Sequence, residues 1–177
     1  MEKELYKFEN EKYEIHGYII DKIPSDIEIY KEYGDLEDED ITKWLFKIGD
    51  KHITILCNDS SYNLDEDKIL VDDNILYVVA AYNFYKIDLD TLECLRYEDF
   101  IDDYEACNKI EKFNKGVIIY GECEVQYFYG KNDSRSFTAM NGISSLINLD
   151  DELLIIESDG TQVTITDTFK AIYDYEL

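Results

Sequence analysis

Three stretches of this sequence repeat the same order of features. Each has a short apolar segment, a turn rich in Asp, Asn, Lys or Gly, a second apolar segment, and then a segment in which apolar and polar residues alternate. Two aligned columns are Ile75, Val117 and Leu153, and Tyr85, Tyr127 and Val163. Both columns have separations of 42 and 36 residues. Alternation with a period of two indicates half-buried strands, and apolar runs bounded by turns indicate central strands, so the repeat predicts antiparallel β-structure.

A strand, a tight turn, a buried strand, a loop, an alternating strand and a return strand make up the meander of a propeller blade. Repeats of about 40 residues are typical of propellers. Residues 44–177 therefore resemble propeller-type blades, although no Trp-Asp or Gly-His signature is present. One further hairpin is predicted upstream, at Trp44–Leu56, which makes three and a half units. We expect an all-β fold with at most short helices, in which the meander units form an open stack or a partial propeller closed by the N-terminal strands. An ordinary antiparallel protein with hairpins at this spacing is the alternative.

The pattern also predicts individual elements. Strands are expected at 68–71, 75–81, 84–88, 109–113, 117–121, 125–129, 146–149, 153–157, 161–166 and 170–175. The predicted core residues are Ile75, Val78, Val117, Ile119, Leu153 and Ile155. Upstream, Tyr13–Ile20 and Asp26–Tyr33 are predicted as strands separated by a turn at Pro24, and Glu98–Ala106 as a short helix. We expect a single domain over 1–177, with N-terminal strands and an acidic loop in 1–43 and the repeated units in 44–177.

Charge restricts the partners of such a chain. Its 17 basic and 41 acidic residues give a formal net charge of −24 at pH 7. A field of this sign repels nucleic acid and attracts basic surfaces. No apolar run approaches the roughly 18 residues of a membrane helix, and the first residues do not resemble a signal peptide. The sequence therefore predicts a cytoplasmic protein without nucleic-acid or membrane partners, whose cysteines are reduced. These cysteines are Cys57, Cys94, Cys107 and Cys123.

Two stretches are the most acidic. The residues we single out there as partner-binding candidates are Asp35, Glu37, Asp38, Glu39 and Asp40 in the first stretch, and Tyr97, Glu98, Asp99, Asp102, Asp103, Tyr104 and Glu105 in the second. One interpretation is that they form solvated loops that prevent edge-to-edge pairing of strands. The other is that they form a recognition surface for a basic partner, with Tyr97 and Tyr104 as aromatic anchors.

Signatures of catalysis are missing from the sequence. It has no G-x-S-x-G, no Gly-rich phosphate loop and no H-E-x-x-H. The run Asp88-Leu-Asp-Thr lacks the Gly and the distant Glu of a calcium loop, and His16 and His52 lie in no zinc-binding pattern. We therefore expect neither an enzyme, nor a cofactor, nor a metal site, although clustered carboxylates leave an enzyme as a minor alternative.

The favoured hypothesis is an acidic binding protein that neutralises a basic protein partner by occlusion. An immunity protein or antitoxin against a toxin, with a nuclease favoured, or a phage-type inhibitor would fit this description. The alternative is a propeller-like scaffold or ligand- or peptide-binding domain without catalysis. The oligomeric state and the identity of the partner are not set by the sequence.

Overall fold

The computed structural model describes residues 4–34, 42–57, 66–80, 83–99, 109–129, 133–149 and 151–174. The chain divides into two compact units, Met1–Asp103 (unit 1) and Tyr104–Leu177 (unit 2). Each unit is described by itself. The expectation of one domain with a boundary at residue 43 stays a prediction.

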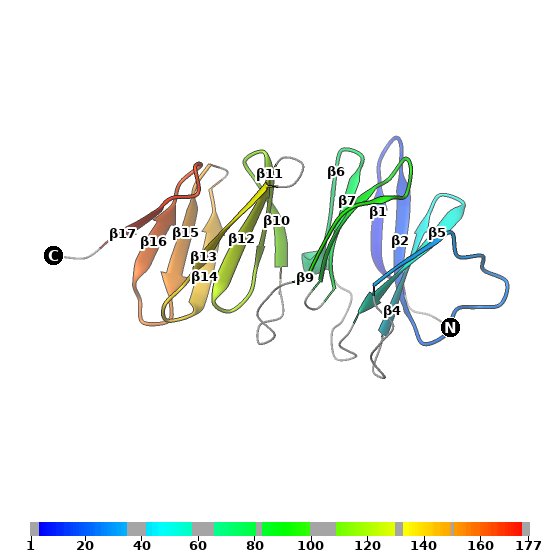
Figure 1. Cartoon of the computed structure of the whole chain (residues 1–177), viewed down its shortest axis with the longest axis horizontal. Helices are drawn as coiled ribbons and strands as arrows, with labels where there is room; N and C mark the ends of the chain where they lie inside the picture. The colour runs from blue at the N-terminus through cyan, green and yellow to red at the C-terminus, as the bar shows by residue number, and fades with distance from the viewer. Residues whose placement is uncertain are drawn as a thin grey trace. The chain divides into compact units, whose positions relative to one another are not determined.

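Unit 1 contains two sheets. The five-stranded sheet has the order β1-β2-β4-β5-β3, in which only β3 runs parallel to its neighbour. Its strands are β1 (Glu4–Glu9), β2 (Glu14–Ile20), β3 (Lys31–Tyr33), β4 (Thr42–Ile48) and β5 (Lys51–Cys57). The second sheet is an antiparallel meander, β6-β7-β8-β9 (Figure 1). It consists of the 3₁₀ turn η1 (Glu66–Lys68) followed by β6 (Ile69–Asp72), β7 (Ile75–Ala80), β8 (Asn83–Asp88) and β9 (Cys94–Asp99).

Unit 2 contains two further four-stranded antiparallel meanders, in the orders β10-β11-β12-β13 and β14-β15-β16-β17. The first consists of β10 (Lys109–Phe113), β11 (Gly116–Tyr120), β12 (Glu124–Tyr129) and β13 (Asp133–Thr138). The second consists of β14 (Ile143–Asn148), β15 (Leu153–Glu157), β16 (Gln162–Ile165) and β17 (Ala171–Asp174). The prediction of an all-β protein built from blade-like antiparallel meanders is therefore confirmed.

Tight turns set the hairpins because their residues tolerate a left-handed backbone. Gly49, Asp73 and Asn114 each open a two-residue turn, and their φ angles are 61°, 53° and 49°. Glycine reaches this region without strain, and Asp and Asn enter it more readily than other side chains. These residues therefore fix the registers of β4 with β5, β6 with β7, and β10 with β11.

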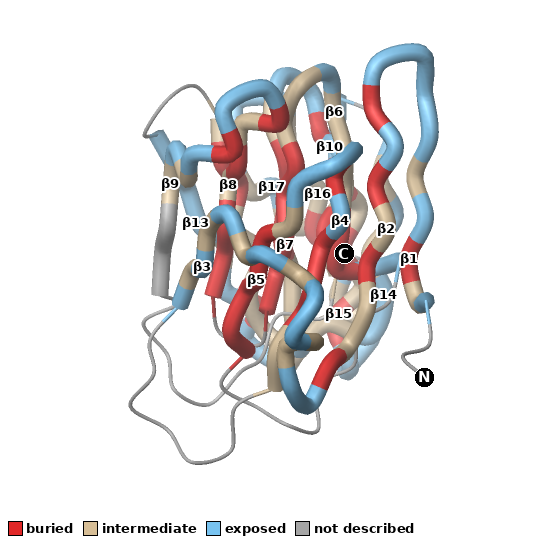
Figure 2. The backbone as a smooth tube through the Cα atoms, turned by 90° about the vertical axis from the view of Figure 1, so that its right-hand side faces the viewer, coloured by how far each residue is buried: buried red, intermediate tan, exposed pale blue. Residues whose placement is uncertain are grey.

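Each unit has a core between its two sheets. In unit 1, Trp44, Phe46 and Ile55 of the five-stranded sheet pack in one cluster with Val78 and Tyr85 of the meander. Figure 2 shows β4, β5 and β7 buried along most of their length. The core of unit 2 joins Phe113, Ile118, Val125 and Tyr127 of one meander to Leu153, Ile155, Val163 and Ile165 of the other.

Most expected strands lie within a residue of their predicted ends, but four expectations were wrong. Ile75 is half-buried, whereas the other five predicted core residues are buried. The strand expected at Asp26–Tyr33 is confined to Lys31–Tyr33, and β14 begins three residues early. The predicted helix at Glu98–Ala106 begins inside β9; its remainder lies outside the described residues. The strands β1, β9 and β13 were not assigned residue ranges by the pattern.

The aligned columns do not match the cross-strand pairing, although the central strands lie where they were predicted. The residues opposite Tyr85, Tyr127 and Val163 are Val78, Ile118 and Ile155, which are not separated by the aligned 42 and 36 residues. The reason is that the hairpin loops differ in length: two residues between β7 and β8, three between β11 and β12, and four between β15 and β16. Cross-strand pairing, and not linear spacing, decides which residues are equivalent.

Candidate functional site

The sequence-predicted partner surface falls largely outside the described residues. Asp35, Glu37, Asp38, Glu39 and Asp40 lie there, as do Asp102, Asp103, Tyr104 and Glu105. The backbone of Tyr97, Glu98 and Asp99 forms the end of β9, an edge strand paired with β8. The candidates therefore stay a prediction.

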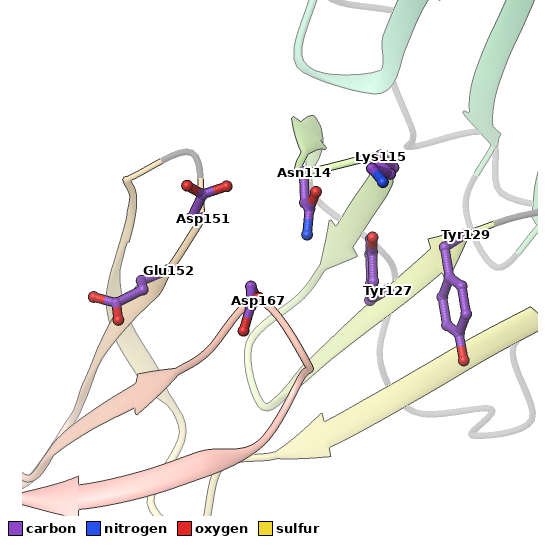
Figure 3. A pocket seen from close by; sticks show the side chains of 7 residues that line it. All are labelled: Asn114, Lys115, Tyr127, Tyr129, Asp151, Glu152 and Asp167. Atoms are coloured by element: carbon purple, nitrogen blue, oxygen red, sulfur yellow. The ribbon is translucent and has the colours of Figure 1, made fainter.

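Unit 2 has a cleft that the sequence did not predict. Its volume is about 610 Å³, and turns from both meanders line it. The lining residues are Asn114, Lys115, Tyr127, Tyr129, Asp151, Glu152 and Asp167. In Figure 3, Asp151 and Glu152 lie on one side, the two tyrosines of β12 on the other, and Asp167 and Asn114 between them. Ligand sites commonly have 300–1,000 Å³, so this cleft is in that size range.

Stacked aromatic rings form one wall of the cleft. Tyr127 and Tyr129 are two apart on β12, so they lie on the same face of the strand, with ring centroids 5.0 Å apart. Phe169 stacks on Tyr127 at 5.5 Å, and Phe113 meets it edge-on at 5.3 Å. Burial raises the pKa of the Tyr127 hydroxyl. Tyr127 is 5% exposed and Tyr129 is half-buried, so little of this aromatic wall is open to solvent.

Room for the Tyr127 ring comes from Gly116, the first residue of β11. A Cβ added at Gly116 would lie 2.1 Å from the carbonyl oxygen of Phe128 and 3.0 Å from Cε2 of Tyr127. A side chain at this position would therefore displace β12 and the aromatic wall.

Arg135 of β13 fastens the outer tyrosine. Its Nε donates to the hydroxyl of Tyr129 at 3.2 Å, and its guanidinium carbon lies 5.5 Å from the centre of the Tyr129 ring. Its Nη1 donates to the carbonyl oxygen of Thr168 in the β16–β17 loop. Arg135 thereby connects the aromatic wall of one meander to a turn of the other.

Carboxylates surround the rest of the cleft. Asp151 and Glu152 belong to the β14–β15 turn and Asp167 to the β16–β17 turn, and all three are exposed. Within the residues that the structure describes, no side chain bonds to any of the three. Lys115 is the single cationic residue of the lining, so the lining has three negative charges against one positive.

The β16–β17 loop holds Asp167 through its backbone. Phe169 has a φ of 56°, and its amide donates to the carbonyl oxygen of Thr166 at 2.8 Å. The amide of Thr166 donates to the carbonyl oxygen of Lys170 at 3.1 Å. The amide of Lys170 also donates to Oγ1 of Thr166 at 3.3 Å. The Phe169 ring is fixed against Tyr127, so this loop places Asp167 beside the aromatic wall.

A second hollow, of about 190 Å³, lies in unit 1 beside the β8–β9 loop. Here Asp90 has side-chain partners. Asp90 accepts from Lys12 at 2.9 Å and from the hydroxyl of Tyr13 at 2.7 Å. The Lys12 ammonium holds the pKa of Asp90 below its usual range. Asp88 accepts from the amides of Asp90 and Thr91 at 3.0 and 2.8 Å. The run Asp88-Leu-Asp-Thr is thus a bonded turn.

Other groups that could do chemistry are dispersed. Across the described ranges, no three His, Cys, Asp or Glu side chains gather as a metal site would require. Cys57 is buried, Cys94 and Cys123 are half-buried, and Cys107 lies outside the described residues. In the part of the chain that the structure describes, no helix has the length and apolar character needed to cross a bilayer. The site with the most developed geometry is therefore the cleft of unit 2.

Sequence reasoning missed the cleft, although part of its signal was present. The pattern predicts the turns at Asn114 and Asp151 and the strand that contains Tyr127. It does not predict that these turns and this strand line the same cleft. The Tyr-x-Tyr spacing of β12, combined with acids in two later turns, was the available clue.

Comparisons with known proteins give little further information. No family model matches the sequence, and no curated protein does. A solved structure to which the chain is similar is PorZ, an essential bacterial surface component of the type-IX secretion system of Porphyromonas gingivalis. The TM-score is 0.45 at 9% sequence identity, and the match covers 97% of this chain and 26% of PorZ. The chain thus spans about a quarter of the length of that protein.

Proposed function

We propose that this chain is a non-catalytic binding protein that neutralises a basic protein partner by occluding it, as immunity proteins and antitoxins do. A toxin with nuclease activity is the favoured partner, because a nuclease presents a positive cleft to phosphate. The observation that carries the proposal is the cleft of unit 2, where three carboxylates that bond to no side chain of the described residues lie beside the tyrosines of β12.

Two features support this proposal, one at long range and one at short range. At long range, a net charge of −24 accelerates encounter with a basic protein. At short range, aromatic rings that exclude water from the centre of a contact are typical of residues that dominate binding energy. We assign long-range attraction to the whole acidic surface, including the stretches at Asp35–Asp40 and Tyr97–Glu105, and close contact to the cleft.

The proposal includes a cytoplasmic location. Disulfide bridges persist mainly in oxidising compartments, so this part of the proposal predicts that all four cysteines titrate as thiols after denaturation without reductant.

A second candidate is a scaffold that binds a peptide or small molecule without neutralising a toxin. The size of the cleft favours it, since 610 Å³ accommodates such ligands. The two functions differ in their dependence on salt. Occlusion of a basic protein weakens as ionic strength rises, whereas binding of a neutral ligand does not.

The test is to mix the protein with a panel of basic nucleases and basic non-nuclease proteins at low and moderate salt. We expect at least one nuclease to bind and to lose activity, with association slower at the higher salt. An Asp99→Asn, Asp102→Asn, Asp103→Asn variant should associate more slowly at low salt, with little change in dissociation. No binding to any basic protein, or binding that salt leaves unchanged, would contradict the proposal.

A further inference from the structure

We propose that Asn141 is a site of covalent modification by deamidation, and that the reaction opens the turn that connects the two meanders of unit 2. Asn141 precedes Gly142, and this is the only Asn-Gly pair in the sequence. Both residues lie between β13 and β14. The inference does not depend on the proposed function.

The reaction needs only the chain itself and water. An asparagine followed by glycine is prone to it, because glycine has no Cβ to hinder its own backbone nitrogen. The nitrogen of Gly142 attacks Cγ of Asn141 and loses its proton, while the Cγ–Nδ2 bond breaks and Nδ2 leaves as ammonia. A cyclic imide results, and a water molecule then opens the ring at one of its two carbonyl carbons. The product is aspartate or isoaspartate at position 141, and nothing is oxidised or reduced.

The folded turn holds the side chain of Asn141 between two carboxylates. Its Nδ2 donates to Oε2 of Glu157 and to Oδ2 of Asp159, both at 2.9 Å. Glu157 also accepts from the backbone amides of Met140 and Asn141, at 3.2 and 3.1 Å. We call these four bonds the connector clasp. Because Nδ2 is the leaving atom and Cγ must approach the next backbone nitrogen, the connector clasp slows deamidation while it is closed.

Deamidation replaces a donor with an acceptor at the centre of the connector clasp. A carboxylate at position 141 has no hydrogen to donate to Glu157 or Asp159, and it adds a third negative charge beside theirs. Glu157 is only 2% exposed, so water screens this repulsion poorly, and a buried charge that loses a donor is costly. The connector clasp therefore stays open after the reaction, whereas the unreacted turn opens and closes reversibly.

The connector that would be released joins loops of both meanders. The amide of Ala139 donates to the carbonyl oxygen of Cys123 in the β11–β12 loop at 2.7 Å. The amide of Ser158 in the β15–β16 loop donates to the carbonyl oxygen of Gly142 at 3.0 Å. Met140 lies in this connector and is 84% exposed. Deamidation would therefore change how the two meanders are joined and also the surface around Met140.

The first experiment measures the rate of deamidation at Asn141. The whole protein is incubated in warm, mildly alkaline buffer, folded or in urea, and mass spectrometry of its peptides follows the exchange of the amide for a carboxyl group. We expect the folded protein to react at least tenfold more slowly than the unfolded protein. Equal rates in the folded and unfolded protein would overturn the inference.

Two variants test the connector clasp in the folded protein, below their unfolding temperatures. Glu157→Ala removes three of its bonds. Asp159→Asn is the milder change, because an oxygen remains for the amide of Thr161, which Asp159 accepts at 2.9 Å. We expect both to react several times faster than the unmodified sequence, and Glu152→Gln, an exposed acid of the same unit, to leave the rate unchanged. Failure of both variants to react faster would overturn the inference.

The last experiment compares two substitutions that add the same charge. Asn141→Asp has the chemistry of one product. Asn10→Asp is the control, because Oδ1 of Asn10 accepts from the amides of Lys12 and Tyr13 at 2.8 and 2.7 Å, and an aspartate keeps these bonds. We expect Asn141→Asp to lower Tm by about 4 °C or more and Asn10→Asp to change it by about 1 °C or less. Equal Tm values for the two variants would show that the product leaves the turn closed, which would overturn the inference.

Discussion

The hollow of unit 1 and the cleft of unit 2 are built from the same kind of turns but use their acids differently. The β8–β9 and β16–β17 loops each contain an apolar residue with a left-handed backbone, Leu92 at φ 57° and Phe169 at φ 56°. In unit 1, the neighbouring acid Asp90 bonds to Lys12 and Tyr13, and the hollow is small. In unit 2, Asp167 has no such partner among the described residues, and the cleft is about three times as large.

The difference teaches that a count of acids does not identify a binding surface. An acid whose lone pairs are satisfied inside the fold contributes to stability, and little binding energy remains for a partner. An acid that is placed by backbone geometry and bonds to no neighbouring side chain keeps its acceptors open to solvent. Five predictions follow this contrast from the largest effect to the smallest.

The core that supports the cleft should be the most sensitive to truncation. Ile155 is fully buried between the meanders of unit 2, so Ile155→Ala should lower the free energy of unfolding by about 2–5 kcal/mol. Ile147, on the neighbouring strand, is 42% exposed, and Ile147→Ala should cost less than about 1 kcal/mol. Urea unfolding measures both, and equal losses would show that the cluster between β11 and β15 is not a packed core.

The aromatic wall should depend on the absence of a side chain at Gly116. Gly116→Ala places a Cβ against the carbonyl oxygen of Phe128 and should cost about 2–3 kcal/mol while shifting the Tyr127 ring resonances. Gly160→Ala is the control, since its Cβ would meet nothing within 4 Å and only its φ of 92° opposes it. A larger loss for Gly160→Ala would mean that backbone strain, and not the contact with β12, is the stronger constraint.

The two loops should respond differently to loss of their acids. Asp88→Ala removes the acceptor for the amides of Asp90 and Thr91, so we expect a loss of about 2 kcal/mol in stability. Asp167→Ala removes no side-chain bond within the described residues and should change stability by less than about 0.5 kcal/mol. Thermal unfolding checks the pair. A destabilised Asp167→Ala would show that its acid is engaged in the fold and is not reserved for a ligand.

Removing Lys12, one of two lysines that line the unit 1 hollow, should have a modest effect. Lys12 forms an exposed ion pair with Asp90 at 2.8 Å, and exposed pairs contribute little to stability. Lys12→Met should therefore barely alter stability in thermal unfolding. A loss as large as that of Asp88→Ala would show that this ion pair holds the β8–β9 loop.

The smallest effect is on acid titration. The Lys12 ammonium lowers the folded pKa of Asp90 below its ordinary value of 3.8. A depressed pKa means that the contribution of Asp90 to stability is present above pH 3.8 and is lost as the pH falls through the folded pKa. NMR titration of the carboxyl carbon should show this low value, and Lys12→Met should raise it. An unchanged pKa in the variant would mean that the Tyr13 hydroxyl, and not Lys12, dominates.

Much of the fold could be predicted because its signals are local. Strand periodicity and turn residues such as Asp73 and Asn114 depend on neighbouring residues, which is why most strands lie close to their predicted ranges. The failures have other causes. Ile75 belongs to the right strand but is its half-buried first residue. Lys31–Tyr33 is a short strand that forms by pairing with β5, which is distant in the sequence.

The sequence by itself determined that this chain forms antiparallel hairpins and has a strongly acidic surface, since both follow from residue type and spacing. Only the tertiary structure decided which residues are equivalent between repeats, because loop lengths shift the cross-strand registers around Val78, Ile118 and Ile155. It alone decided that Tyr127 and Tyr129 share a cleft with Asp151 and Asp167. The two tyrosines belong to one meander and the two acids to turns of the other. Contact between sheets depends on packing among residues that are far apart in the sequence, so periodicity along the chain does not predict it.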